Sequence, residues 1–202
     1  MITSMCNSYE HTIVITNRHL VQGDFLEQLE KVTKLHPHAL ILREKDLTDD
    51  AYESLAKKVF DLCKREDITC FLHTKIEIAR KIGCQNIHLS IPVLKGLSET
   101  EKKALTEDFC EISISCHSME DVEIAMAGGA TQIILGTIFE TECKKGVLGK
   151  GVEFVREICQ KCPLPVYAIG GMNLQKLPLV IDAEAAGCCM MSGFMQTTKP
   201  LQ

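Results

Sequence analysis

The chain alternates between short apolar segments rich in β-branched residues and longer segments whose apolar residues recur at helical spacing. The short segments predict eight strands, at residues 11–16, 39–42, 68–72, 86–89, 112–116, 133–139, 166–169 and 188–191. Helices are predicted between them, at residues 24–35, 49–63, 74–81, from 98 onward, 118–129, 151–160 and 173–186. This strict alternation predicts a parallel sheet with helices packed on it.

Helix starts and breaks give the pattern its boundaries. Thr74, Ser98 and Ser118 each precede an acidic residue by three positions, which predicts a capped helix start at all three places. Pro178 is expected to disturb the predicted helix at residues 173–186 near its first turns.

Two architectures fit a parallel sheet of this size: an open doubly wound sheet and a closed (β/α)₈ TIM barrel. The first predicted strand is not followed by a G-x-G-x-x-G turn, which removes the usual reason to prefer a dinucleotide-binding fold. Eight β-α units favour the barrel, in a single domain over residues 1–202.

The sequence after the eighth predicted strand is too short for a full eighth helix. After Phe194 only eight residues remain, so the eighth helix is expected to be missing or truncated. The outer face of the first and last strands would then be uncovered, and exposed apolar surface of that kind is usually buried. Either residues 1–10 or a second subunit could cover it, and we predict a homodimer.

Composition narrows the classes of partner. Hydrophobic residues make up 46% and charged residues 24% of the 202 positions, which is typical of a globular protein. The formal net charge of −5 argues against a nucleic-acid binder. There is no apolar run of membrane-spanning length and no signal-peptide pattern at residues 1–10, so we expect no membrane partner and a cytoplasmic location.

Eleven cysteines are scattered along apolar segments, which is typical of reduced thiols used as small core residues. Cys159 and Cys162 form a lone C-x-x-C without a second pair, so neither a metal site nor a cofactor is predicted.

The last three predicted strands end in residues that suit an anion. Gly170 and Gly171 follow one strand, and Ser192 and Gly193 follow the next. Barrel enzymes bind phosphate at these strand ends, where glycine lets backbone N–H groups approach closely. Lys144 lies in a glycine-bounded loop after residues 133–139 and could clamp the charge. Ordinary turn glycines and a solvated lysine remain the structural alternatives.

Alternation assigns further side chains to the barrel interior. Arg43 and Lys45 share a face with Ile41, so both cations point inward if Ile41 does. By the same rule Ser115 and His117 face inward. His117 could instead be satisfied by a neighbouring strand end. His73 ends another strand and is either a second imidazole of the site or a polar strand terminus.

Four segments together resemble the thiamine-phosphate synthase/TenI superfamily. They are Leu42-Arg43-Glu44-Lys45, Ser115-Cys116-His117-Ser118, Phe139-Glu140-Thr141-Glu142-Cys143-Lys144-Lys145-Gly146 and Ala168-Ile169-Gly170-Gly171-Met172. The resemblance extends over residues 13–194 and implies a (β/α)₈ barrel that binds a phosphorylated thiazole or thiamine-related small molecule. It implies substrate-binding roles for Thr137 and Thr141.

The synthase branch of that superfamily joins a pyrimidine pyrophosphate to a thiazole phosphate with magnesium. The resemblance implies that Arg43 and Lys45 hold the pyrophosphate. Where the branch has a glutamine this chain has Ile41, and its Asn-Asp pair is matched by His73-Thr74. Its His-Leu-Gly-Gln-Glu-Asp motif is matched by residues 88–93, so both magnesium-linked aspartates are replaced.

The other branch contains the thiazole tautomerase TenI, which moves a proton without metal. Its Phe-Glu-Thr-Asp-Cys-Lys-Lys-Gly motif is nearly identical to residues 139–146, whereas its catalytic histidine is matched by Thr137. Three hypotheses follow: a tautomerase in which His117 or His73 carries the proton, a divergent synthase, and a non-catalytic binder or regulator of thiazole or thiamine phosphates.

Overall fold

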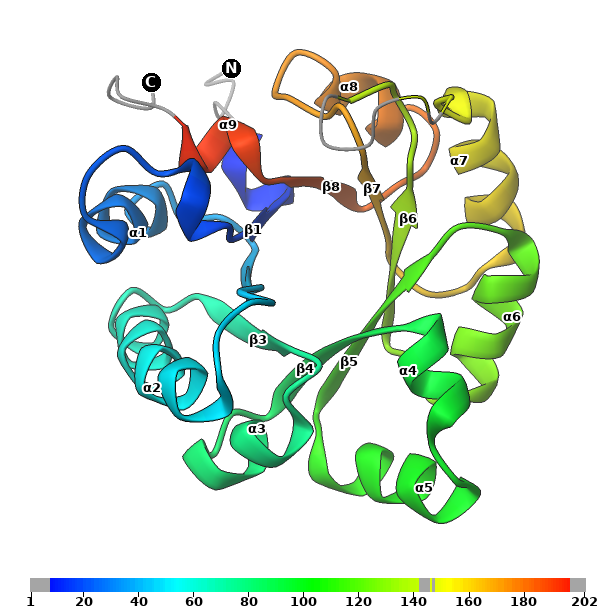
Figure 1. Ribbon diagram of the computed structural model, residues 1–202. Helices are drawn as coiled ribbons and strands as arrows, with labels where there is room; N and C mark the ends of the chain where they lie inside the picture. Colours follow the sequence, from blue (N-terminus) through cyan, green and yellow to red (C-terminus); the bar gives the residue numbers. More distant parts are fainter. Residues whose placement is uncertain (1–7, 142–145, 147, 197–202) are drawn as a thin grey trace, which may run out of the picture.

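A closed barrel of eight parallel strands forms the centre of the protein (Figure 1). The computed structural model describes residues 8–141, 146 and 148–196. Each strand pairs with its neighbours in sequence, and β8 closes the barrel on β1. The strands are β1 (Thr12–Ile15), β2 (Ala39–Leu42), β3 (Thr69–His73), β4 (Asn86–Ser90), β5 (Glu111–Cys116), β6 (Gln132–Gly136), β7 (Val166–Ile169) and β8 (Gly187–Met190). The predicted TIM barrel is confirmed.

Helices surround the strands on the outside (Figure 1). They are α1 (Phe25–Thr33), α2 (Asp49–Arg65), α3 (Ile76–Ile82), α4 (Ile91–Gly96), α5 (Glu99–Asp108), α6 (Met119–Ala127), α7 (Gly151–Lys161), α8 (Leu177–Ile181) and α9 (Ser192–Met195), with 3₁₀ turns η1 (Ser8–His11) and η2 (Arg18–Leu20). No helix in these ranges is long and apolar enough to cross a membrane.

Two of the three predicted N-caps are confirmed. Ser98 forms a full capping box, and the Ser118 side chain accepts a hydrogen bond from the third residue of its helix. Thr74 is wrong, because α3 begins one residue later and its N-cap is Lys75, without a side-chain cap. Thr74 has a positive φ of 63°, and its hydroxyl donates to the carbonyl of His73 at 2.7 Å.

Two helix boundaries differ from the sequence pattern. The helix predicted at residues 173–186 is reduced to α8, and Pro178 lies in its first turn, where a missing N–H is tolerated. The sequence pattern also did not predict α4, which follows β4 directly and has Pro92 in its first turn. In both places proline lies in the first turn of a short helix.

Within the described range, the chain after β8 forms the four-residue α9. Phe194 of α9 is buried, and its ring centroid lies 6.0 Å from that of Tyr9 in η1. Gln28 of α1 donates its side-chain amide to the Phe194 carbonyl at 2.6 Å. Tyr9 and α1 therefore cover part of the face that a full helix would occupy, and the homodimer stays a prediction.

The inward and outward faces of the strands bury different sets of side chains. The barrel interior packs a small apolar cluster made of Ile13, Ile15, Ala39, Ile41, Phe71, Ile134, Tyr167 and Cys189. The outward residues form the larger core between strands and helices. Seven of the nine described cysteines are buried, and all nine are free thiols. The small interior cluster forms the floor beneath the open end of the barrel.

Candidate active site at the carboxyl end of the barrel

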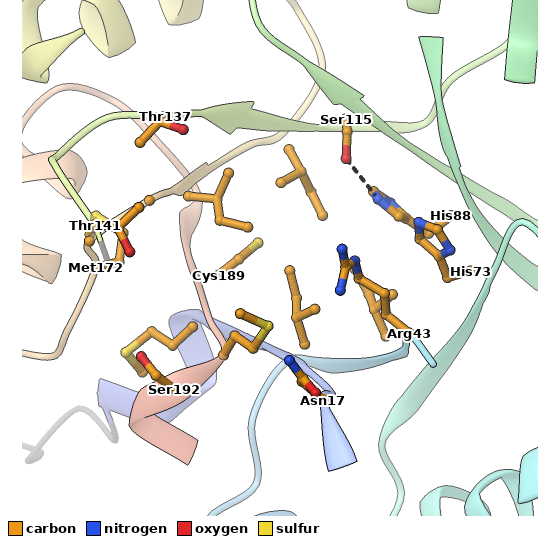
Figure 2. A pocket seen from close by; sticks show the side chains of 18 of the residues that line it. Asn17, Arg43, His73, His88, Ser115, Thr137, Thr141, Met172, Cys189 and Ser192 are labelled. Carbon is orange, nitrogen blue, oxygen red and sulfur yellow. Dashed lines mark hydrogen bonds between the residues drawn. The ribbon is translucent and has the colours of Figure 1, made fainter. Parts of the chain in front are cut away.

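A cavity of about 540 Å³ opens at the carboxyl ends of the strands. It brings together most of the side chains that the sequence singled out, namely Arg43, Lys45, His73, Ser115, His117, Thr137, Thr141, Gly170, Gly171 and Ser192. Arg43 lies on the opposite side of the cavity from Thr141 and Met172 (Figure 2). The cavity therefore has a cationic wall facing a wall built from the loops after β6 and β7.

The charge of this cavity has one sign. Arg43 and Lys45 line it, and none of its described lining residues is an aspartate or a glutamate. Three imidazoles, those of His73, His88 and His117, also line it. A cavity lined by cations and by no described carboxylate favours a bound anion, because the positive potential of its wall attracts negative charge.

A buried carboxylate holds the backbone beside Arg43 in place. Glu44 is 2% exposed and is not among the residues that line the cavity. It accepts a 2.7 Å bond from the Thr16 hydroxyl, which in turn accepts the Arg43 N–H at 2.9 Å. Arg18 donates its backbone N–H and guanidinium to Glu44 at 3.1 Å, and its guanidinium also pairs with Asp46. Ile41, Arg43 and Lys45 therefore line the cavity while Glu44 does not, as the predicted alternation requires. The hydrogen bonds of Glu44 also connect the loops after β1 and β2.

His88 is the principal residue that the sequence analysis left out of the site. It is 4% exposed, and its Nδ1 and Nε2 lie 2.9 Å and 2.8 Å from the hydroxyls of Ser113 and Ser115. Burial, and then the charges of His73 and Arg43, lower its pKa to about 3, so the ring is neutral near pH 7. The sequence alone placed it in a predicted strand and assigned it no role.

His73 is a second neutral imidazole in the cavity wall. Its ring centroid lies 5.6 Å from that of His88. Burial, followed by the nearby cations Arg43 and Lys45, lowers its pKa to about 4. A group with that pKa accepts a proton poorly at neutral pH.

His117 is fixed by its own main chain and by its ring. Its Nδ1 lies 2.5 Å from the carbonyl oxygen of Gly136, which can only accept, so Nδ1 carries a proton. Its backbone N–H donates to Asp121 at 2.7 Å, and its carbonyl accepts from the ammonium group of Lys150. In the neutral ring the lone pair is therefore on Nε2, which makes His117 an oriented base.

The two glycines after β7 are required by their own loop. Gly170 and Gly171 have φ of 102° and 60°. A Cβ on Gly170 would lie 2.4 Å from the Thr137 side chain, and one on Gly171 would lie 2.4 Å from the Glu140 carbonyl. Lys176 donates to the Gly171 carbonyl at 2.7 Å. Close packing of the β6 and β7 loops thus accounts for both glycines, whether or not phosphate binds there.

One predicted site residue does not join the others, and another lies outside the described residues. Gly193 is exposed in α9 and is not among the residues that line the cavity. Lys144 lies outside the described residues, as does Cys143. The lining also includes Asn17, Ser90 and Met172, which the sequence analysis did not single out. Ser90 ends β4 and Asn17 lies two residues after β1, and a position at a strand end is the signal by which both could have been found.

Comparison with known proteins decides the family. The thiamine monophosphate synthase family model matches residues 12–194. The chain belongs to this family. A putative thiamine-phosphate synthase 2 of Aquifex aeolicus is 30% identical over 182 residues, covering 90% of this chain and 96% of the relative. A thiamine-phosphate synthase of Coprothermobacter proteolyticus is 30% identical over 154 residues, covering 76% and 72%.

A solved structure agrees with the fold. The thiamine phosphate pyrophosphorylase from Pyrococcus furiosus superposes with a TM-score of 0.81 at 22% identity, covering 95% of this chain and 90% of the other. The family resemblance is therefore confirmed, and the chain is a member of a thiamine-biosynthesis family. The relatives carry the synthase name, so the comparisons establish the family and not its tautomerase branch.

The magnesium that the synthase branch implies does not fit the described cavity. Magnesium prefers carboxylate oxygens, and the described lining offers none. Among the residues that the structure describes, no group of three or more histidines, cysteines or acidic residues is arranged to hold a metal. Glu44 and Asp46, the acidic residues next to Arg43 and Lys45 in the sequence, are paired with Arg18.

Proposed function

We propose that this protein binds a phosphorylated thiazole and moves a proton on its ring, as the thiazole tautomerase branch of the family does. The observation that carries the proposal is the orientation of His117. Its Nδ1–H is engaged by the Gly136 carbonyl at 2.5 Å, so Nε2 is the basic atom of a ring that lines the cavity. Nε2 would take a proton from one atom of the ring, and a proton would return at another.

The two walls of the cavity suit the two ends of such a ligand. The phosphate would lie against Gly170, Gly171 and Ser192, at the strand ends where barrels bind phosphate. A second acidic group, such as a carboxylate, would bind near Arg43, on the opposite side of the cavity from Thr141 and Met172 (Figure 2), with Lys45 also in the lining. A crystal structure with the thiazole phosphate bound tests this, and phosphate density away from Gly171 and Ser192 contradicts it.

A divergent synthase is the second candidate. It is favoured by the names of the curated relatives and by Arg43 and Lys45, which the family resemblance links to a pyrophosphate. The described lining gives that pyrophosphate no carboxylate-bound metal, which is why we rank it second. A non-catalytic binder is the third candidate, because Thr137 stands where the tautomerase branch has its histidine and a hydroxyl is a poor base.

Two assays on the full chain separate these candidates. The first follows the thiazole carboxylate phosphate by ¹H NMR in the presence of EDTA. The second supplies the thiazole phosphate together with the pyrimidine pyrophosphate, with and without magnesium. Turnover in the first assay alone supports the tautomerase. Magnesium-dependent coupling supports the synthase, and binding without turnover in either assay supports the non-catalytic alternative.

A further inference from the structure

A line of three polar side chains crosses the barrel interior beside the cavity. Ser113 is fully buried, His88 is 4% exposed, and Ser115 lines the cavity. His88 Nδ1 lies 2.9 Å from the Ser113 hydroxyl. On the other side of the ring, His88 Nε2 lies 2.8 Å from the Ser115 hydroxyl, and Figure 2 shows this contact as a dashed line. The proposed reaction assigns no role to Ser113 or to His88.

The hydrogen bond that the Ser113 hydroxyl makes determines which nitrogen of His88 carries the proton. Among the residues that the structure describes, His88 Nδ1 is its one side-chain hydrogen-bond partner. A buried O–H that finds no acceptor loses its hydration without compensation. Ser113 therefore donates its proton to Nδ1, which must be the bare nitrogen of the ring.

The hydrogen bond between His88 Nε2 and Ser115 then has a fixed donor and a fixed acceptor. A neutral imidazole has one donor nitrogen and one acceptor nitrogen, and the pKa of His88 near 3 keeps the ring neutral. With Nδ1 accepting from Ser113, Nε2 carries the proton and donates it to Ser115. The Ser115 oxygen is then engaged as an acceptor, and its own O–H is left to point into the cavity.

We propose that Ser113 and His88 are positioning residues that make Ser115 a hydrogen-bond donor toward the ligand. Ser115 then recognises an acceptor atom, such as an oxyanion or an unprotonated ring nitrogen. Arg43 and Lys45, which line the same cavity, are also donors only. The choice of a thiazole phosphate as ligand rests on the proposed function, whereas the placement of the proton on His88 Nε2 does not.

The proton arrangement is tested first, without ligand. Long-range ¹H–¹⁵N correlations of protein labelled at histidine distinguish the protonated ring nitrogen from the bare one. The His88 signals are assigned by their loss in His88→Gln. We expect a neutral ring protonated on Nε2 at pH 7, unchanged in Ser115→Ala because Ser113 sets the tautomer. A ring protonated on Nδ1, or on both nitrogens, overturns the proposal.

The consequence for binding is tested with a matched pair of variants. The amide of glutamine at position 88 reaches the place of Nε2 and can still donate to Ser115, whereas asparagine reaches only the place of Nδ1. Titration with the thiazole phosphate is expected to give about tenfold weaker binding for His88→Asn than for His88→Gln. The difference is expected to vanish when both are combined with Ser115→Ala.

The outcomes separate the two proposals. Equal losses in the two variants, or a difference that persists in the Ser115→Ala background, overturn the positioning role. If the wild-type protein fails to bind the thiazole phosphate, the proposed ligand is wrong. In that case the tautomer of His88 in the wild-type protein still tests the arrangement of protons by itself.

Discussion

Replacing Gly170 by alanine would drive a methyl group into the β6 loop that carries Thr137. The new Cβ would lie 2.4 Å from the Thr137 methyl and 3.0 Å from its Cα, at a backbone φ of 102°. Gly23 provides a matched control, because its φ is 108° and a Cβ at that position would meet no atom within 4 Å. The two substitutions therefore share the backbone strain and differ in the collision.

The magnitude follows from separating these two terms. Positive φ at a non-glycine residue costs about 1–3 kcal/mol and applies equally to Gly170→Ala and Gly23→Ala. Overpacking at Gly170 adds about 1–3 kcal/mol, because the nearest atoms belong to main chain and to a buried β-branched side chain. For a chain of this size that difference lowers the melting temperature of Gly170→Ala by about 2–12 °C relative to Gly23→Ala.

Thermal denaturation followed by circular dichroism measures this difference directly. The displaced Thr137 also belongs to the cavity lining, so turnover or ligand affinity is expected to fall in Gly170→Ala and to persist in Gly23→Ala. Equal melting temperatures for the two variants would refute the steric reasoning, and with it the tight apposition of the β6 and β7 loops.

Two further predictions concern stability. Glu44→Ala removes a carboxylate that is 2% exposed and bonded to Thr16 and Arg18, so it is expected to lower the unfolding free energy by about 2–4 kcal/mol. Asp46→Ala is the control, because Asp46 is an exposed partner of the same arginine, and it is expected to change the denaturation midpoint little. His73 has a folded-state pKa of about 4, below its ordinary value near 6.5, so the unfolded chain binds the proton first and stability falls as the pH drops through that window. Urea titrations are expected to show a shallower acid loss for His73→Asn, and an unchanged slope contradicts the burial argument.

The barrel could be read from the sequence because its strands are short, apolar and separated by helical segments. Period-two alternation also placed Arg43 and Ser115 on the cavity side, since a strand whose outward residues pack on helices leaves its other face for the interior. These inferences need only neighbours along the chain.

The parts that escaped prediction depend on distant contacts. His88 lies in a predicted strand, and only its pairing with Ser113 and Ser115, on the next strand of the barrel, gives it a polar role. The fixed orientation of His117 depends on a carbonyl 19 residues away. Thr74 matched a capping pattern, yet its positive φ excludes it from the N-cap.

The central claim is that His117 carries the proton in a cavity that binds a thiazole phosphate. The most direct test compares His117→Gln with His19→Gln, a matched substitution at an exposed histidine that does not line the cavity. The thiazole carboxylate phosphate is the substrate, in EDTA. We predict that kcat falls by about 10²–10⁴-fold in His117→Gln, with KM little changed, and stays at the wild-type value in His19→Gln. Full turnover by His117→Gln would contradict the account.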